Sequence, residues 1–272
     1  MIHFSPAKIN LGLQILERRQ DGFHELRSVM YPIGLCDIIE IHQLAGDQVP
    51  VSFTQSGIRF EGDQEKNLCI QAWNLMASFL SLPPVAIHLH KQIPVGAGLG
   101  GGSSNASTIL KGLNLLAGSP VSHNRLADMA AQLGSDCPFF LHDVPMLMEG
   151  RGELLSQLKV NLRPNYLVLL FPEIHISTAE AYAAVTPAIP DSDLRQVIEA
   201  PMNNWKKLLV NDFEESTFIR HPLLKDLKLG LYNAGAKFAS MSGSGSSLYG
   251  IFESAPALPE EIQKYVIWKG PV

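Results

Sequence analysis

The N-terminal part of the chain alternates strictly between apolar and polar residues. Apolar side chains occupy every second position from Ala7 to Ile15. The positions between them are held by Lys8, Asn10, Gly12 and Gln14. A period of two residues is typical of a β-strand with one apolar and one polar face. The pair Asp21-Gly22 then indicates a turn, and residues 26–35 predict the strand that follows it.

Further along the chain, short apolar runs predict strands, and apolar positions three and four apart predict helices. We expect strands at residues 37–44, 51–55, 85–90 and 166–171, and on either side of 242–247. We expect helices from near Ser103 to Ala117 and at residues 67–80, 122–133, 193–200, 203–210, 222–233 and 259–265. Gly118 and Gly134 are placed to end two helices, and the capping box Ser177-x-x-Glu180 is placed to begin another.

The length of the chain and the order of these elements indicate two domains. A chain of 272 residues is long enough for one large domain or two ordinary ones. A new series of predicted elements begins after Arg163-Pro164 with the buried strand at 166–171, so a domain boundary is expected within 155–163. We therefore predict domains at residues 1–158 and 159–272.

Composition excludes several classes of protein. With 46% hydrophobic and 17% charged residues, the chain is typical of a soluble globular protein, and no apolar run approaches the roughly 18 residues that span a bilayer. The N-terminus shows no secretory signal pattern. The three cysteines are too few and too irregularly spaced for a disulfide framework or a zinc site. A net charge of −5 gives no footprint for nucleic acid or anionic lipid.

The stretch PVGAGLGGGSSNAST, residues 94–108, holds five glycines within seven positions and joins a predicted strand to a predicted helix. A helix N-terminus offers unpaired N–H groups and a partial positive charge, and glycines let an anion approach the backbone. No Asp or Glu occurs from Lys66 to Arg125, as expected if a bound anion disfavours carboxylates there. The alternatives are a purely structural glycine turn and, for the missing acids, chance within a buried segment.

Three familiar motifs do not account for this loop. Residues 96–101 match the dinucleotide pattern GxGxxG literally, yet no acidic residue follows about 20 positions later to bind a ribose. The chain has neither a Walker A sequence nor the GxSxG elbow of α/β-hydrolases. The loop is therefore expected to be a phosphate loop of another kind.

Several separated motifs resemble those of the GHMP kinases. Residues 94–106 are similar to the glycine-serine phosphate loop of that family, and PAKINLGL at 6–13 and SGSGSS at 242–247 are similar to the elements that accompany it. Together with DGFHEL at 21–26 and GSDCPFF at 134–140, they resemble the branch of the family that acts on 4-diphosphocytidyl-2-C-methyl-D-erythritol. The resemblance covers nearly the whole chain.

This resemblance implies ATP-dependent phosphorylation of the 2-hydroxyl group of that substrate, in the non-mevalonate route to isoprenoid precursors. It implies a two-domain α+β fold, with an N-terminal domain like ribosomal protein S5 domain 2 and a ferredoxin-like C-terminal domain, and a cleft where ATP and substrate meet. Mg²⁺ is expected to arrive with ATP, and no protein ligand is assigned to a metal. We expect a cytoplasmic monomer or weak homodimer, although a processed plastid protein would look the same.

The resemblance also implies two catalytic residues. Asp136 is similar to the aspartate that orients or deprotonates the attacking hydroxyl group. Lys8 is similar to the lysine that keeps this aspartate ionised and steadies the moving phosphoryl group. From the residues alone, Asp136 would instead cap a helix before Pro138, and Lys8 would be an exposed lysine on the polar face of an edge strand.

The remaining site residues follow from the same resemblance. Asn10 shares the polar strand face with Lys8, and His24 is similar to a cytosine-recognising histidine. Phe23 and Tyr182 correspond to aromatic residues that sandwich the pyrimidine, with Phe23 replacing a commoner tyrosine. Without the resemblance, these would be a turn histidine and two core aromatics. The residues expected to bind ATP are Pro94, Gly96, Ala97, Gly98, Leu99, Gly100, Gly101, Gly102, Ser103 and Ser104, with Asn67 near the adenine.

Three other functions would keep part of this pattern. Another GHMP kinase, of the homoserine, mevalonate or galactose class, would keep the loop without the cytosine features. A non-catalytic nucleotide-binding module would keep the loop but would not need both Lys8 and Asp136. A dinucleotide-dependent oxidoreductase is disfavoured by the missing ribose carboxylate.

Overall fold

The structure is a computed structural model that describes residues 1–46, 49–59 and 67–272. Its strands are β1 (Ile2–Arg18), β2 (His24–Gln43), β3 (Val51–Gly57), β4 (Val85–Lys91), β5 (Met146–Glu149), β6 (Leu154–Gln157), β7 (Tyr166–Leu170), β8 (Phe238–Met241), β9 (Leu248–Phe252) and β10 (Val266–Pro271). Its α-helices are α1 (Leu68–Phe79), α2 (Gly101–Leu116), α3 (His123–Leu133), α4 (Thr178–Ala184), α5 (Leu194–Glu199), α6 (Trp205–Leu208), α7 (Phe213–Arg220), α8 (Pro222–Asn233) and α9 (Glu260–Gln263). The described residues also form the 3₁₀ helices η2 (Pro138–Leu141) and η3 (Met202–Asn204). Within the described ranges, no helix has the length and apolar character needed to cross a membrane.

Contacts between Cα atoms divide the chain into two compact units. Unit 1 comprises Met1–Ala7, Leu35–Val95 and Gly100–Asp143, and unit 2 comprises Lys8–Gly34, Gly96–Leu99 and Val144–Val272. The long strands β1 and β2 therefore contribute residues to both units. The predicted domain boundary at 158/159 falls inside the last stretch of unit 2 and stays a prediction.

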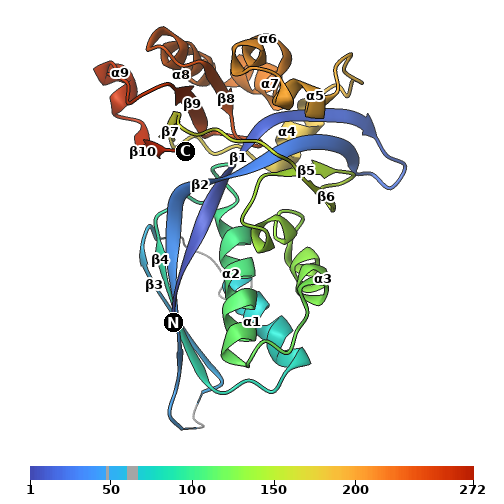
Figure 1. The fold of residues 1–272 in the computed structure, drawn as a ribbon, viewed down its shortest axis with the longest axis vertical. Coiled ribbons are helices and arrows are strands. Elements are labelled where there is room, and N and C mark those ends of the chain that lie inside the picture. Colours follow the sequence, from blue (N-terminus) through green and yellow to red (C-terminus); the bar gives the residue numbers. More distant parts are fainter. Residues whose placement is uncertain (47–48, 60–66) are drawn as a thin grey trace. The chain divides into compact units, whose positions relative to one another are not determined.

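Unit 1 is a sheet covered on one face by α1, α2 and α3 (Figure 1). The last part of β2, residues 38–43, pairs antiparallel with β4, and β3 pairs parallel with β4. Side chains of β4 alternate between buried and half-buried, as expected of a sheet with one covered face. The core between sheet and helices includes Ile39, Ile41, Met76, Ile87, Ile109, Leu113 and Met129.

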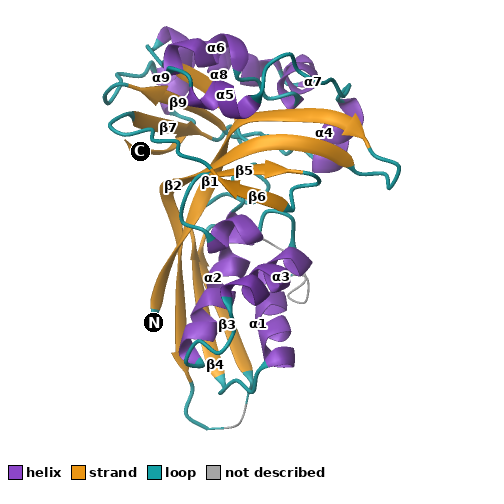
Figure 2. Cartoon of the chain, turned by 45° about the vertical axis from the view of Figure 1, so that its right-hand side comes forward, coloured by secondary structure: helices purple, strands orange, loops and turns teal. Residues whose placement is uncertain are grey.

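Unit 2 contains a four-stranded sheet with the strand order β10-β7-β9-β8, in which all neighbours are antiparallel. Counted along the chain this order is 4-1-3-2, with helices between β7 and β8 and between β9 and β10, which is the ferredoxin-like arrangement. Helix α8 lies against this sheet (Figure 2). The predicted ferredoxin-like C-terminal part is thereby confirmed.

Several predicted elements differ in extent from the observed ones. The strands expected at 26–35 and 37–44 form the one continuous strand β2, and α2 begins at Gly101 rather than near Ser103. Ser177 is the N-cap of α4, but its side chain makes no capping hydrogen bond, so the capping box is wrong in that respect. The strands β5, β6 and β10 and helix α7 were not predicted from the sequence.

Candidate active site

The backbone path of the glycine loop, which joins β4 to α2, requires glycine at alternate positions. Gly96, Gly98 and Gly100 have φ angles of 68°, 77° and 69°. These values lie in the left-handed region, where a residue with a Cβ atom is strained. Glycine at these three positions is therefore explained by the shape of the loop, without any ligand.

Close packing adds a second requirement at two glycines. A Cβ atom on Gly98 would lie 2.0 Å from the carbonyl oxygen of Ser242 in unit 2. A Cβ atom on Gly101 would lie 2.9 Å from both Ile93 Cγ2 and Lys91 Nζ in unit 1. An alanine would therefore clash with backbone at position 98 and with packed side chains at position 101.

Neither a left-handed φ angle nor close packing explains the glycine at position 102. It is exposed in the first turn of α2, and its φ is not among the left-handed values. The nearest atom to an added Cβ would be Leu68 Cδ1 at 3.5 Å, which is an ordinary van der Waals contact. Glycine in a helix is less favourable than alanine, so its presence here fits a surface that a ligand must approach closely.

Among the residues that the structure describes, no side chain caps the first turn of α2. The N-cap is Gly100, which makes no side-chain capping bond, and the first turn contains no acidic residue. The first backbone bond of the turn runs from Ser104 N to Gly100 O (2.9 Å), so the N–H groups of residues 101–103 precede it. Ser104 is fully engaged inside the fold, because its hydroxyl pairs with that of Ser5 at 2.8 Å. Of the two predicted loop serines, Ser103 is the half-exposed one.

A buried ion pair supports the start and the end of the loop within unit 1. Lys91 Nζ donates to Asp37 Oδ2 (2.5 Å), and Asn105 Nδ2 of α2 donates to the same oxygen (2.9 Å). Asp37 Oδ1 accepts the backbone N–H groups of Gln92 and Ile93 at 2.7 and 2.8 Å. Burial lowers the pKa of Lys91, and the Asp37 carboxylate opposes that change. The carboxylate therefore fixes the end of β4 and the first helical turns with four hydrogen bonds.

Lys8 is buried beside the first half of the loop in unit 2. It is 4% exposed, and its Nζ donates to Gly98 O at 3.0 Å and to Asn10 Oδ1 at 2.5 Å. Asn10 Nδ2 donates to Ser28 Oγ at 2.8 Å, so the asparagine is itself held in place. The interpretation of Lys8 as an exposed lysine is wrong, because unit 2 covers the polar face of β1. The structure brings Lys8 and Asn10 together, as the sequence predicts.

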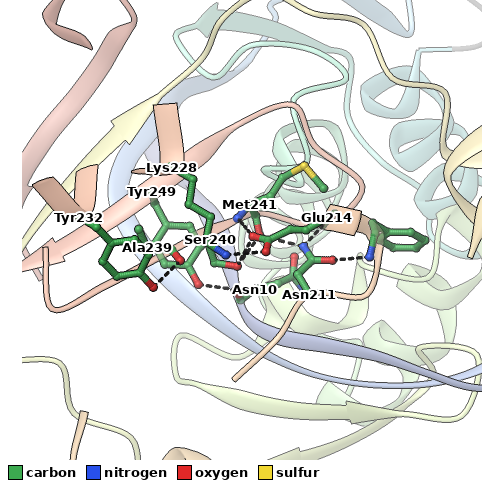
Figure 3. Close-up of polar contacts among 11 residues, drawn as sticks. Asn10, Asn211, Glu214, Lys228, Tyr232, Ala239, Ser240, Met241 and Tyr249 are labelled. Atoms are coloured by element: carbon green, nitrogen blue, oxygen red, sulfur yellow. Dashed lines mark hydrogen bonds and ion pairs between the residues drawn. The ribbon is translucent and has the colours of Figure 1, made fainter. Parts of the chain in front are cut away.

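The SGSGSS turn, residues 242–247 between β8 and β9, packs against the loop. Ser242 Oγ donates to Gly98 O (2.9 Å), and Ser247 N donates to Ala97 O (3.2 Å). A network of polar side chains from α7, α8 and the strands surrounds the base of this turn (Figure 3). The expected proximity of the turn to the phosphate loop is confirmed.

Asp136 lies in the turn between α3 and η2, and it is half-exposed. The N-cap of η2 is Cys137, so the interpretation of Asp136 as the helix cap before Pro138 is wrong. Burial raises the pKa of the neighbouring Cys137 thiol to about 11. Ser107 Oγ donates to Cys137 O (2.7 Å), which ties this turn to α2 within unit 1.

The aromatic residues assigned to the pyrimidine belong to unit 2. The His24 ring stacks on the Tyr182 ring, with centroids 5.0 Å apart and planes at 30°, and Tyr182 meets Phe213 edge-on at 4.9 Å. Phe23, next to His24 in the hairpin, is 56% exposed and carries the Arg151 guanidinium 5.0 Å from its ring centroid. The structure thus joins His24 to Tyr182 directly and leaves a face of Phe23 open to solvent.

Two further assignments have structural outcomes. Asn67 is the N-cap of α1, where its Oδ1 accepts Cys69 N at 2.9 Å, so this side chain already has a role in folding. In the parts of the chain that the structure describes, no group of three or more His, Cys, Asp or Glu residues is arranged to hold a metal ion.

Sequence reasoning missed Asp37 and Lys91, although the pattern carried a signal for both. Lys91 follows Leu89 in the buried register of β4, and Asp37 precedes Ile39 in the buried register of β2. Two opposite charges in the apolar registers of two strands indicate a buried ion pair. Asn211, which lies between α6 and α7, had no such signal.

The comparisons with known proteins cover both halves of the chain. Residues 67–143 match the N-terminal domain of the GHMP kinases, and residues 186–267 match their C-terminal domain. The 4-diphosphocytidyl-2-C-methyl-D-erythritol kinase of Parabacteroides distasonis is 43% identical over 99% of each chain. The enzyme of the same name from Bacteroides thetaiotaomicron is 44% identical, over 96% of this chain and 95% of its own.

A solved structure agrees with the sequence relatives. The crystal structure of a 4-(cytidine 5′-diphospho)-2C-methyl-D-erythritol kinase superimposes with a TM-score of 0.80 and 32% identity, over 97% of this chain and 93% of that one. This agreement confirms the predicted two-domain α+β fold. The relatives match over nearly the full length of the chain, and the glycine loop with a buried lysine beside it agrees with them. The chain therefore belongs to the GHMP kinases, in the 4-diphosphocytidyl-2-C-methyl-D-erythritol kinase family.

Proposed function

We propose that this chain transfers the γ-phosphoryl group of ATP to the 2-hydroxyl group of 4-diphosphocytidyl-2-C-methyl-D-erythritol, a step of the non-mevalonate route to isoprenoid precursors. The near-full-length relatives are named for this kinase. The structural observation that carries the proposal is the uncapped, acid-free first turn of α2 behind a glycine-rich loop. Few other features of a soluble chain attract a polyphosphate so directly.

The ATP phosphates are proposed to bind at the loop through backbone donors. The N–H groups of residues 101–103 point out of the helix start with no intrahelical acceptor, and the helix dipole adds a partial positive charge. Gly102 leaves that surface without a side chain. The hydroxyl of half-exposed Ser103, which hydrogen-bonds with the Cys137 side chain, is proposed to bond to a phosphate oxygen as well. Asn67 is proposed to lie near the adenine while it caps α1.

Lys8 and Asp136 are proposed to act on the transferred group and on its acceptor. Phosphoryl transfer depends on positioning, charge neutralisation and an oriented nucleophile. Lys8 supplies a positive charge whose place is fixed by Gly98 O and Asn10 Oδ1. Asp136 is proposed to accept the proton of the 2-hydroxyl group as the new P–O bond forms. Asn10 is proposed to contact the substrate from the same strand face.

The cytidine end of the substrate is proposed to bind at the hairpin that joins β1 to β2. Phe23 offers an exposed aromatic face, and a pyrimidine stacks well on such a face. His24 carries ring nitrogens suited to the polar edge of cytosine, and Tyr182 holds the His24 ring by stacking. The lost hydroxyl at position 23, compared with the commoner tyrosine, removes one hydrogen bond but not the stacking surface.

Mg²⁺ is proposed to enter with ATP and to neutralise charge on the phosphates. Mg²⁺ in kinases is held mainly by phosphate oxygens and water with one or two carboxylates, so it does not need a preformed cluster of protein ligands. We further propose that the enzyme works in the cytoplasm as a monomer or weak homodimer.

A substrate panel tests the proposal. The purified protein is incubated with Mg-ATP and, separately, the cytidylyl substrate, homoserine, mevalonate and galactose, and ADP release is followed. We expect turnover of the cytidylyl substrate alone. Preferential turnover of another alcohol would overturn the substrate assignment, and ATP binding without any turnover would favour a non-catalytic nucleotide-binding module.

A further inference from the structure

Asn211 uses its whole side chain to hold the SGSGSS turn. The residue is 3% exposed, and its Nδ2 donates to Met241 O and to Gly243 O, both at 2.9 Å. Its Oδ1 accepts the N–H group of Phe213 at 3.0 Å, at the start of α7 (Figure 3). An amide has two N–H donors and one carbonyl acceptor, so these three bonds occupy each of its polar atoms.

No other side chain of this size makes the same set of bonds. An ionised carboxylate has no N–H or O–H group to donate to the two carbonyls. A hydroxyl group has a single donor, so it cannot bond to both carbonyls. The three bonds therefore require asparagine at position 211. Since an unmade bond at a buried carbonyl is costly, the turn depends on this residue for its shape.

The turn transmits that shape to the phosphate loop and to Lys8. The two carbonyls that Asn211 holds flank Ser242 on either side. Ser242 Oγ donates to Gly98 O at 2.9 Å, and Lys8 Nζ donates to the same oxygen at 3.0 Å. A shift of Ser242 would therefore move the acceptor that fixes the ammonium group.

The backbone around Asn211 is attached to the strand that carries Lys8. Leu13 N of β1 donates to Val210 O at 2.8 Å, and Asp212 N donates to Leu13 O at 2.9 Å. On the other side of the turn, the Tyr249 hydroxyl donates to Asn10 O at 2.7 Å. The turn and the Lys8 segment of β1 are thus held in one frame within unit 2.

We propose that Asn211 is a positioning residue for phosphoryl transfer, acting through Ser242 on the Gly98 carbonyl and Lys8. The inference rests on the proposed kinase function. It predicts that Asn211 governs the use of ATP and the rate of transfer, and that it does not govern affinity for the cytidylyl substrate.

The test compares Asn211→Asp and Asn211→Ala with a matched control, Asn114→Asp. Asn114 is 7% exposed, and its amide makes an analogous pair of backbone bonds, to Val121 O (3.0 Å) and from Val121 N (2.9 Å), in unit 1. For each variant, kcat and both KM values are measured well below its melting temperature. We expect the Asn211 variants to lose about ten- to hundredfold in kcat/KM for ATP, with KM for the cytidylyl substrate within about twofold of wild type. We expect Asn114→Asp to be destabilised but to keep kcat/KM for ATP within about twofold.

A second variant tests the same path without changing Asn211. Ser242→Ala removes the bond to Gly98 O, and its effect on kcat/KM for ATP should not add to that of Asn211→Ala, because both act through one contact. Full additivity, an unchanged kcat/KM in Ser242→Ala, or an equal loss in Asn114→Asp would overturn the proposal. An inactive wild type would instead refute the kinase function. In that case, calorimetric titration of the same variants with ADP tests the positioning of the loop, and equal affinity throughout would overturn it.

Discussion

The substitution Gly102→Ala distinguishes between two explanations of the glycine loop: a purely structural turn and a phosphate-binding site. Among the described residues, an added Cβ meets only Leu68 Cδ1, at 3.5 Å, which is an ordinary van der Waals contact. Replacing glycine by alanine in a helix gains up to about 1 kcal/mol of stability. For a protein of this size, that gain corresponds to a rise in melting temperature of about 2–4 °C.

The same methyl group covers the surface where the phosphates are proposed to approach the backbone. We expect KM for ATP to rise at least about tenfold, equivalent to roughly 1.4 kcal/mol of lost binding, while the protein becomes more stable. Melting is followed by calorimetry, and KM is measured by ADP release at saturating cytidylyl substrate. A stabilised variant with weaker use of ATP cannot be explained by damage to the fold.

The matched control is Asn124→Ala, at the second residue of α3 and exposed like Gly102. It should gain stability by the same helix preference and leave KM for ATP unchanged. Gly98→Ala marks the opposite limit, since its Cβ would lie 2.0 Å from Ser242 O, and it should lose both stability and activity. If Gly102→Ala is stabilised and keeps the wild-type KM for ATP, the phosphate-binding interpretation of the loop is refuted.

Four other substitutions or conditions probe separate parts of the molecule. Asp136→Asn should lower kcat by about 100-fold or more when activity is measured well below the melting temperature of the variant, and a loss of only a few-fold would contradict its proposed role as proton acceptor. Asp37→Asn should cost about 3–5 kcal/mol in urea unfolding because it leaves the buried Lys91 without its charged partner, whereas the double variant Asp37→Asn/Lys91→Met, which removes both charges and keeps an acceptor for Gln92 N and Ile93 N, should recover much of that loss. Phe23→Ala should raise KM for the cytidylyl substrate about tenfold through lost stacking and leave KM for ATP unchanged. Burial raises the pKa of Cys137 to about 11 from 9.0, so its thiol contributes stability that is present below pH 9 and lost as the pH rises toward 11. The unfolding free energy of Cys137→Ala should therefore fall less between pH 8 and 10 than that of wild type.

Local patterns in the sequence were enough for much of the site. The alternation around Lys8 and Asn10 predicts β1 correctly, and the glycine stretch followed by an apolar helical face predicts the loop and α2. These features need only neighbouring residues, because strand period, turn glycines and helix caps are determined over a few positions. The branch of the family was also evident, because the motifs near both ends and in the middle agree.

What the sequence could not supply is the partner of each polar group. Gly98 is glycine partly because Ser242 O lies over it, and nothing in the sequence around either residue indicates that contact. The face of β1 that holds Lys8 looks solvent-exposed by its polarity, yet it is buried by residues far along the chain. Asn211 holds the SGSGSS turn through carbonyls about 30 residues away, as its bond to Met241 shows. Tertiary contacts of this kind override local preference.

The interleaving of the two units has a consequence for how the protein is made. All segments of unit 1 have been synthesised once residue 143 has left the ribosome. The segment 8–34 belongs to unit 2, so it can pack only after the C-terminal sheet has been synthesised. The bond between Tyr249 and Asn10 closes over 239 residues of sequence. At translation speeds of about 5–20 residues per second, synthesis of the intervening residues leaves the inner side of this strand uncovered for roughly 10–50 seconds, and chaperones bind nascent chains in that state.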